Sequence, residues 1–514
     1  MDYVLLLGFL LFCLCMKPVV TFLLDKKDLH KYHQVNFLAG FTSLAHVWEH
    51  RHRARSEVLR QKHQSHAILR LGPNDLSFAD VAAIKDIYGH YSPCRKDDMY
   101  NLTAGSHGNM LNVVDRDEHA RKRRMLSHAF STKNLENWEF KIREKTEHFV
   151  KHIDQCCTSP LSDSTVKPED LKLKFRLYSN LLTIDVIADI AMSEKLGMIE
   201  QGSPTVNIDG GETSRPLNFI RSLHGAPRVS SPIIRTGSLF QTLKFLSWWL
   251  SSEVRSNWGE SEKFTKIVSN LASKNIDKFS STEKQSDFLG YLMLDKAGGL
   301  RSLERGELEA ELHILLDAGS DTTAIALTNA VYYLLKSPKV LVALRREIDE
   351  ALSGETIAPF SKVKNLPFLR ACIDEGLRLS PPIARGLERK TPPEGMRIMD
   401  QHIAGNVTVA VPTYVIHRNP NIFEDPDAYN PHRWFGEKEK VDQMRAAFIP
   451  FSTGGRACIG RNITFIEQQI VLATLVYGYE FALPSKNWEL QREEYFNYWP
   501  SEMPLKVWKR QLPT

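Results

Sequence analysis

The 514-residue sequence lacks most of the features that mark nucleic-acid-binding, secreted or nucleotide-binding proteins. Its net charge at pH 7 is only +5, and no tract of Lys and Arg interleaved with aromatic residues points to nucleic acid. Its seven cysteines are too few and too irregularly spaced for a disulfide framework or a C-x-x-C zinc site, which indicates a reducing compartment. No G-x-G-x-x-G motif lies between a strand and a helix, so we predict no flavin or nicotinamide site.

Long apolar runs are also scarce, and the clearest one lies at the N-terminus. Tyr3–Met16 carries no charge, Lys17-Pro18 interrupts the run, and Val19–Leu24 continues it. A membrane span needs roughly 20 apolar residues. A cleaved signal peptide is the alternative, but neither a basic segment before the run nor a small-residue cleavage site after it is present. We therefore expect a membrane anchor over residues 1–24.

The flanking charges orient this anchor. Asp2 precedes the apolar run, and Lys26, Lys27 and Lys31 follow it, which by the positive-inside rule puts the body of the protein in the cytosol. Residues 25–66 are rich in His and Arg and are expected to form a basic linker, either a surface for anionic lipid headgroups or a solvated helix face. Residues 67–514 are expected to form one domain.

The most informative stretch is residues 451–460, Phe-Ser-Thr-Gly-Gly-Arg-Ala-Cys-Ile-Gly. Its glycines allow a tight turn and a close approach to a flat ligand. Arg456 and the start of the following helix favour the thiolate form of Cys458. Such a thiolate is a nucleophile or a metal ligand. A buried structural cysteine is the alternative for any lone Cys.

A second unusual segment lies inside the longest helical pattern, residues 302–336, which Pro338 ends. It contains Ala318-Gly-Ser-Asp-Thr-Thr323. A glycine in a helix costs about 1 kcal/mol against alanine, and a mid-helix threonine tends to bond to the carbonyl four residues earlier. We expect a local distortion that opens a polar notch in an apolar wall, with a kinked core helix as the alternative.

Two further helices carry charged pairs at helical spacing. His119 and Arg123 lie four residues apart in a basic helix, so they share a face that suits a ligand with carboxylates, or simply faces solvent. Glu375 and Arg378 lie three residues apart in another helix. A surface ion pair of this kind contributes little.

Together these motifs resemble those of the cytochrome P450 haem-thiolate monooxygenases. The pattern F-x-x-G-x-R-x-C-x-G is matched at every fixed position, by Phe451, Gly454, Arg456, Cys458 and Gly460. The oxygen-activation motif A-G-x-D-T-T is matched completely by residues 318–323, and the E-x-x-R motif by Glu375 and Arg378, with Arg433 as a third partner. The resemblance covers nearly the whole chain after residue 24.

The resemblance implies a mainly α fold with small β-sheets, in which haem b is buried between a long central helix and the cysteine loop. It implies that Cys458 is the axial iron ligand, that Thr322 and Asp321 supply protons to O2, and that Phe451, Gly454 and Gly460 shape the loop around the haem. The residues implied to neutralise the haem propionates are Arg456, Arg123, Arg389 and His119, the last in place of the family's usual Trp.

The implied activity is insertion of one oxygen atom of O2 into a lipophilic substrate, with electrons from NADPH through a separate reductase. The implied site is the endoplasmic reticulum membrane. Residues 112–123 and 446–453 are similar to fungal benzoate 4-monooxygenases, and many fungal biosynthetic monooxygenases share such stretches. We expect a secondary metabolite as substrate, with a small aromatic acid as the alternative. A haem-thiolate isomerase or peroxygenase and a non-enzymatic haem sensor are the competing classes.

The substrate pocket is expected to be lined by four parts of the chain: residues 91–111, 217–250, the face around Leu315, and 383–387. Within the second of these, residues 239–250 are unusually apolar and form either core packing or a substrate-entrance or membrane-dipping element. Arg385 could meet an acid such as benzoate or could simply be solvated.

Overall fold

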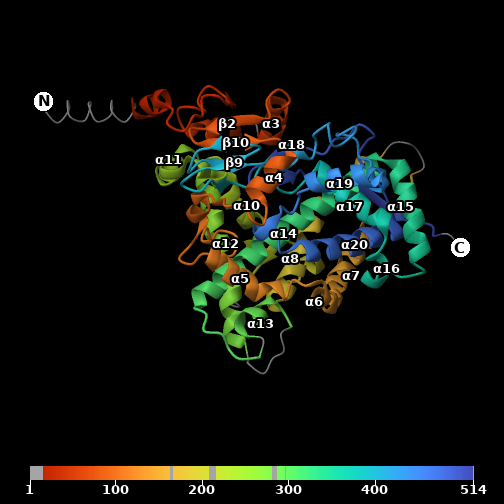
Figure 1. Ribbon diagram of the computed structural model, residues 1–514. Coiled ribbons are helices and arrows are strands. Elements are labelled where there is room, and N and C mark those ends of the chain that lie inside the picture. The colour runs from red at the N-terminus through yellow and green to blue at the C-terminus, as the bar shows by residue number, and fades with distance from the viewer. Residues whose placement is uncertain are drawn as a thin grey trace.

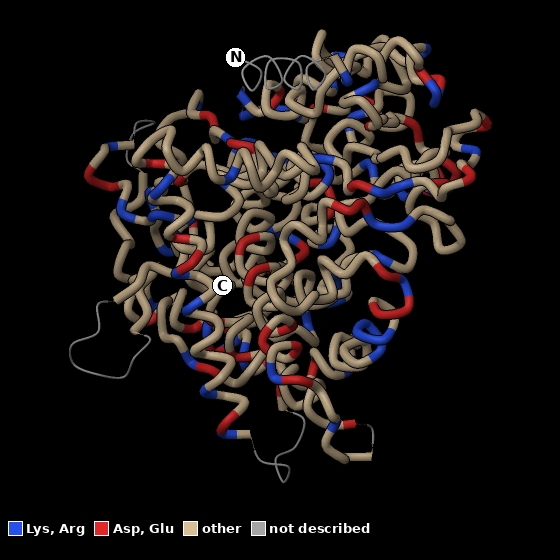
Figure 2. The backbone as a smooth tube through the Cα atoms, turned by 90° about the vertical axis from the view of Figure 1, so that its left-hand side faces the viewer, with Lys and Arg blue, Asp and Glu red and all other residues tan. Residues whose placement is uncertain are grey.

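Helices form most of the molecule, and short strands are gathered into small sheets (Figure 1). The computed structural model describes residues 16–512, except residues 52, 162–165, 208–215, 280–285 and 296. Acidic and basic residues are interspersed over the molecule (Figure 2). The predicted mainly α fold with small β-sheets is therefore confirmed.

The helices in the first two thirds of the chain lead up to the long central helix α14. They are α2 Leu44–His50, α3 Arg55–His63, α4 Val81–Tyr88, α5 Arg116–Ser127, α6 Thr132–Asn137, α7 Glu139–Cys156, α8 Phe175–Met192, α9 Met198–Gln201, α10 Phe219–Ser230, α11 Phe240–Leu250, α12 Ser252–Lys278, α13 Phe288–Met293 and α14 Arg305–Lys336.

The remaining helices surround the second half of the core. They are α15 Pro338–Ala351, α16 Phe360–Val363, α17 Pro367–Leu379, α18 Thr413–Ile416, α19 Lys438–Ala447 and α20 Arg461–Gly478. Short 3₁₀ helices are η1 Asp98–Thr103, η2 Pro168–Asp170, η3 Ile234–Leu239, η4 Pro431–Phe435 and η5 Gly454–Arg456.

The largest sheet has six strands in the order β1-β2-β3-β11-β8-β4. They are β1 His33–Gln34, β2 Ile68–Gly72, β3 Asp75–Phe78, β11 Thr408–Ala410, β8 Arg389–Lys390 and β4 Arg95–Lys96. The smaller sheets contain β5 Leu173–Lys174, β6 Thr205–Val206, β7 Leu217–Asn218, β9 Met396–Ile398, β10 Gln401–Ile403, β12 Tyr479–Ala482, β13 Arg492–Glu494, β14 Tyr498–Pro500 and β15 Pro504–Lys509.

The main hydrophobic core is built around α14, which packs along α8 and also contacts α17 and α20. The helix runs without a break through residues 318–323, so the expected distortion is not found. The glycine at position 319 is instead explained by a neighbouring helix, because a Cβ there would lie 2.5 Å from Cγ1 of Ile187 on α8. The glycine lets the two helices approach closely.

Residues 25–66, expected to be a basic linker, contribute β1, α2 and α3 to the folded body. His33 pairs with Leu69 of β2 in the parallel β1–β2 ladder. His50 and Arg55, expected on a solvated or lipid-facing surface, are buried. The backbone N–H of Ser56 donates to Glu494 at 2.6 Å, across more than four hundred residues of sequence.

Most of the expected anchor, residues 1–15, lies outside the described residues, and residues 16–24 are helical. In the part of the chain that the structure describes, no helix combines the length and the apolar character needed to cross a bilayer.

Candidate active site

A tight loop connects α19 to α20 and carries Cys458. The Cys458 backbone N–H donates to the Phe451 carbonyl at 2.8 Å, which closes the loop. Gly454 has a φ of +70°, and a Cβ there would lie 2.1 Å from the Tyr88 carbonyl oxygen, so this position requires glycine. At Gly460 a Cβ would make only ordinary van der Waals contacts. The loop is thus closed by its own backbone and fitted against α4.

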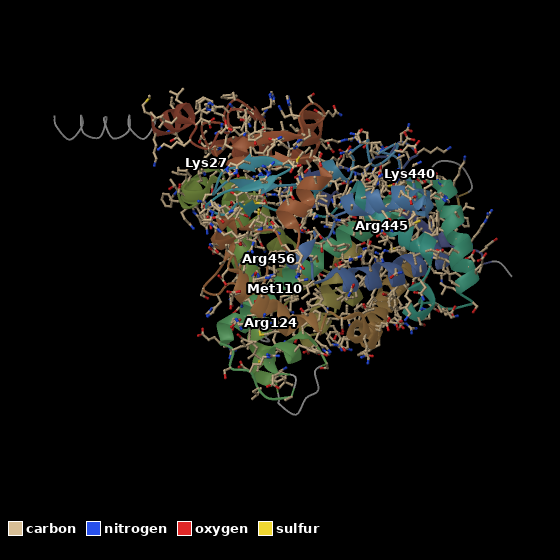
Figure 3. All side chains as sticks on the ribbon, in the orientation of Figure 1. Lys27, Met110, Arg124, Lys440, Arg445 and Arg456 are labelled. Atoms are coloured by element: carbon tan, nitrogen blue, oxygen red, sulfur yellow. The ribbon has the colours of Figure 1, made fainter. Side chains whose placement is uncertain are left out.

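An internal cavity separates this loop from α14. Cys458 is open to the cavity although it lies deep inside the protein. On the facing wall Ala318 is exposed to the same cavity, and Thr322 lines it one turn later. Thr322 Oγ1 donates to the Ala318 carbonyl at 2.9 Å, as predicted. Met110 and Arg456, which also line the cavity, lie near the centre of the molecule (Figure 3).

Basic side chains gather along one edge of the cavity: Lys96, His119, Arg123 and Arg456. Arg389 lies opposite Lys96 in the antiparallel β4–β8 pair. Burial and the charges of Arg456 and Lys96 lower the pKa of His119 to about 3. Burial and Arg389 lower the pKa of Arg456 to about 10. This mutual repulsion indicates a site that is complementary to an anion.

Two of these arginines also tie the loop to its surroundings. The Arg456 guanidinium donates to the carbonyls of Val113, Val114 and Asp115 at 2.7, 2.9 and 2.9 Å. Arg123 Nη1 donates to the Ala457 carbonyl at 2.7 Å. The predicted pairing of His119 and Arg123 on one face of α5 is therefore found, and that face lies against the loop.

Burial raises the pKa of the Cys458 thiol above its ordinary value. The backbone N–H groups of Gly460 and Arg461 and the charges of Arg123 and Arg461 act in the opposite direction. The sequence predicts Arg456 for this stabilising role. In the structure the role falls to Arg123 and Arg461, while Arg456 bonds to backbone carbonyls.

Asp321 points away from the cavity-lining face of α14, and its carboxylate is surrounded by donors. Burial alone would raise the pKa of Asp321, but Arg176 and His224 hold it well below its ordinary value. The donors come from α8, α10 and the β13–β14 hairpin: Arg176 at 2.5 Å, Asn180 at 3.1 Å, His224 at 3.2 Å, Asn497 at 3.0 Å, and Trp499. Asp321 therefore connects four segments that surround the site.

Glu375, Arg378 and Arg433 form a buried ionic triad, as the sequence predicts. Glu375 and Arg378 have no exposed side-chain surface. Glu375 Oε1 accepts from Arg378 at 2.9 Å and from Arg433 at 3.0 Å. Arg378 Nη1 donates to the His417 carbonyl at 2.8 Å and to the Pro426 carbonyl at 2.7 Å. The triad joins α17 to the segment that leads to η4.

His417, which no motif singles out, extends this network to the cysteine loop. Its Nδ1 lies 3.1 Å from the Arg378 carbonyl, and the Ile449 N–H donates to its Nε2 at 2.9 Å. Burial and Arg378 lower the pKa of His417 to about 3, so the ring is neutral and can accept this bond. Ile449 lies two residues before Phe451, where the loop begins.

The motifs also miss three charged residues that line the cavity: Lys96, Asp317 and Glu467. Burial raises the pKa of Glu467 to about 8. Burial and Asp321 raise the pKa of Asp317 to about 7. The sequence signal for Asp317 is a single charge in the otherwise apolar run before Ala318. Lys96 and Glu467 carry no comparable signal.

Only some of the segments that were expected to line the substrate pocket line the cavity. Met110, Leu315 and Ile383 line the cavity, as predicted, whereas none of the described residues in 217–250 does. Arg385 does not line it either, because it is buried and paired with Glu388.

Residues 239–250 do not form the core packing that is one of their two interpretations. Most large apolar side chains of α11 are exposed, with Phe245 at 66%, Trp249 at 67% and Leu250 at 77%. Only Phe240 of this helix is buried. The entrance or membrane-dipping interpretation therefore remains.

Comparison with known proteins identifies the class to which this site belongs. The family model for cytochrome P450 matches residues 37–498, and the chain belongs to that family. It is 28% identical over 450 residues to the cytochrome P450 monooxygenase efuB of Hormonema carpetanum, covering 86% of this chain and 83% of that protein. It is 29% identical over 485 residues to the benzoate 4-monooxygenase bphA of Aspergillus niger, covering 92% of each.

The fold agrees with this assignment. The crystal structure of the cytochrome P450DA heme domain superimposes with a TM-score of 0.71 at 18% identity, covering 89% of this chain and 94% of that one. The protein is therefore a cytochrome P450 monooxygenase, and its family uses haem iron with a cysteine thiolate and O2.

The residues around the cavity fit a haem. The Cys458 thiol lies on one wall and is open to the cavity. The facing wall has only the small side chain of Ala318 at this point, which leaves room for a flat ring. The basic edge has the charge needed for two propionates, and the pKa of His119 is lowered first by burial and then by the cations gathered beside it.

Proposed function

We propose that this protein is a membrane-bound monooxygenase that oxidises a lipophilic substrate of secondary metabolism, with electrons from NADPH through a separate reductase. The observation that carries the proposal is the arrangement of Cys458 opposite Ala318 and Thr322, with basic side chains along one edge of the cavity between them. A small aromatic acid is the alternative substrate, because a benzoate 4-monooxygenase is among the similar proteins.

The proposed roles follow from the contacts. Cys458 would hold the haem iron, and Lys96, His119, Arg123, Arg389 and Arg456 would neutralise the propionates. When bound, the haem supplies the activation of O2 for attack on a C–H bond. Thr322 Oγ1, which donates to Ala318, keeps its lone pairs free to accept a hydrogen bond from a group in the cavity.

Asp321 would act differently from Thr322. Its carboxylate already accepts from five donors on three other segments. We propose that it positions α14 against α8 and α10 and connects the cavity to the surface through His224, which also lines a surface pocket beside α12. Protons would reach Thr322 by this route through water.

The Thr322→Ala variant tests the proposed proton path. We expect the haem spectrum to stay normal and product formation to fall by about 10²-fold, the lower end for a general acid–base group. Electrons should go to hydrogen peroxide instead. The measurement compares NADPH consumed, peroxide formed and product formed, using a reductase and a substrate found by spectral titration.

Thr328→Ala is the matched control, because Thr328 Oγ1 makes the same bond to the carbonyl four residues earlier, at 2.8 Å to Ala324, away from the cavity. Its coupling should equal that of the wild type. Unchanged coupling in Thr322→Ala would remove Thr322 from the mechanism. Turnover with peroxide alone, and none with reductase and NADPH, would instead identify a peroxygenase.

We also propose that the protein lies on the endoplasmic reticulum membrane through its N-terminal segment and α11. In Figure 1 the helical residues 16–24 and α11 both lie at the upper left edge of the molecule. Leu23 and Leu24 are 70% and 61% exposed, comparable to Phe245 and Trp249 of α11. Exposed aromatic and aliphatic side chains on a helix favour burial in the headgroup region.

A labelled Phe245→Cys variant tests this surface. With an environment-sensitive fluorophore attached, we expect its emission to shift to shorter wavelength when the full-length protein is reconstituted into phosphatidylcholine vesicles. Val342→Cys on α15, an exposed apolar position on the opposite side (Figure 1), should show no shift. Equal behaviour of the two labels would contradict membrane contact by α11.

A further inference from the structure

A carboxyl group inside the cavity has no partner. Asp317 lies on α14 directly before Ala318 and lines the cavity. It is only partly exposed, and among the described residues it makes no hydrogen bond or ion pair. Buried polar groups are nearly always hydrogen-bonded, so an unpartnered carboxyl group in a ligand cavity indicates a contact to the ligand.

A second acceptor lines the same cavity. Asn497, in the turn between β13 and β14, donates from Nδ2 to Asp321 Oδ2 at 3.0 Å. Because a carboxylate only accepts, this bond assigns the two ends of the amide. The remaining Oδ1 is buried and has no partner in the described part of the protein.

Cations are absent from this part of the cavity wall among the described residues. The basic residues that line the cavity belong to the edge cluster of Lys96, His119, Arg123 and Arg456. Arg385 is paired with Glu388 away from the cavity. A substrate carboxylate near Asp317 would therefore meet a like charge without a partner, which is unfavourable in a site shielded from water.

Building on the proposed monooxygenase function, we propose that Asp317, together with Asn497 Oδ1, anchors a hydrogen-bond-donating group of the substrate, an amine or a hydroxyl, and selects against carboxylates. Two unpartnered acceptors are complementary to a donor. A few fixed polar groups in an apolar pocket set the orientation of a ligand.

The protonation of Asp317 is consistent with this role. Burial and Asp321 raise its pKa to about 7, so the carboxyl group is readily ionised in slightly alkaline solution. A protonated amine or an alcohol of the substrate would then act as the hydrogen-bond partner that Asp317 lacks within the described residues. The hydrogen bond to a charged acceptor is stronger than one between neutral groups.

Four probes that share a phenylbutyl scaffold test the proposal: N,N-dimethyl-4-phenylbutylamine, 4-phenylbutanol, butylbenzene and 4-phenylbutanoate. The tertiary amine is chosen because its bulk hinders direct binding to iron. Dissociation constants are measured at pH 8 on the full-length haem-loaded protein by spectral titration and by equilibrium dialysis. We expect the wild type to bind the amine and the alcohol more tightly than butylbenzene, and 4-phenylbutanoate most weakly.

Two variants separate the charge from the hydrogen bond. Asp317→Leu should weaken the binding of the amine at least tenfold and tighten the binding of butylbenzene and 4-phenylbutanoate. Asp317→Asn should keep its affinity for the alcohol but no longer prefer the amine. Glu309→Gln, which removes a carboxylate from the outer side of the same helix, where it bonds to Ser269 and Ser273, should leave all four constants unchanged.

The proposal is contradicted if Asp317→Leu leaves the amine and alcohol constants unchanged, if 4-phenylbutanoate binds the wild type most tightly, or if neither donor probe binds up to its solubility limit. The carbon monoxide spectrum of each reduced sample is read first. A wild type without a thiolate-type band would refute the proposed function. A normal band without the expected preference would refute only the role of Asp317.

Discussion

Cys458→Ala is expected to abolish the absorption band that the reduced protein gives with carbon monoxide when a thiolate ligates the haem iron. Among the described cysteines only Cys458 lines the cavity. The loop would survive the change, because its closure depends on the backbone bond from residue 458 to Phe451 and on Gly454. The expected loss is therefore one of ligation, and monooxygenase activity should fall below detection.

The spectrum of the purified, dithionite-reduced variant under carbon monoxide is the measurement. Cys157→Ala is the control, since this half-buried cysteine lies at the end of α7 and does not line the cavity. It should keep the full band. A surviving thiolate band in Cys458→Ala would show that another residue ligates the iron, and the proposed arrangement of the site would be wrong.

Glu375→Gln is expected to destabilise the protein by about 3–5 kcal/mol, the usual cost of removing one partner from a buried ion pair. The substitution keeps the shape of the side chain but removes the charge between Arg378 and Arg433. Both guanidiniums would remain buried. Because Arg378 also bonds to the His417 carbonyl, and His417 holds Ile449, the cysteine loop should loosen as well.

The measurement is the urea midpoint of the haem-loaded protein, together with the amount of haem retained after purification. Asp442→Asn is the matched control, because it removes one carboxylate from an exposed pair with Lys438 on α19. Exposed pairs of this kind contribute about 0–1 kcal/mol, so its midpoint should barely move. Equal midpoints for Glu375→Gln and the wild type would show that the triad does not support the loop.

The local sequence predicts much of the site. The cysteine loop can be read from glycine positions, because Gly454 has a positive φ that few other residues adopt. The bond from Thr322 to the Ala318 carbonyl follows from helix geometry alone. The pairing of Glu375 with Arg378 follows from their spacing. These features depend on residues near one another in the chain.

The rest of the site depends on contacts that spacing cannot predict. The donors to Asp321 come from α8, α10 and the β13–β14 hairpin, with up to 178 residues between partners. Such contacts appear only when the helices and the hairpin are packed. The same holds for Lys96, which reaches the cavity because β4 pairs with β8 at the edge of the six-stranded sheet.

Two expectations about the fold are wrong, and each has a physical reason. The segment 25–66 is basic, but some of its charges pair with distant acids, as the ion pairs of Arg53 with Glu493 and of Arg60 with Asp427 illustrate. Composition alone therefore suggests a linker where there is a packed region. Gly319 suggests a distortion of α14, but the glycine is required because Ile187 of α8 packs against it. The spacing of residues within one helix carries no information about the helix that packs beside it.

The basic edge of the cavity has a consequence for how the cell makes this protein. Five positive or protonatable groups from four segments are packed where they repel one another, as the lowered pKa values of His119 and Arg456 show. A dianionic cofactor removes that repulsion, and a ligand that binds only the folded chain stabilises it. Haem binding is therefore expected to stabilise the folded chain, and protein made without haem should unfold more readily than the loaded enzyme.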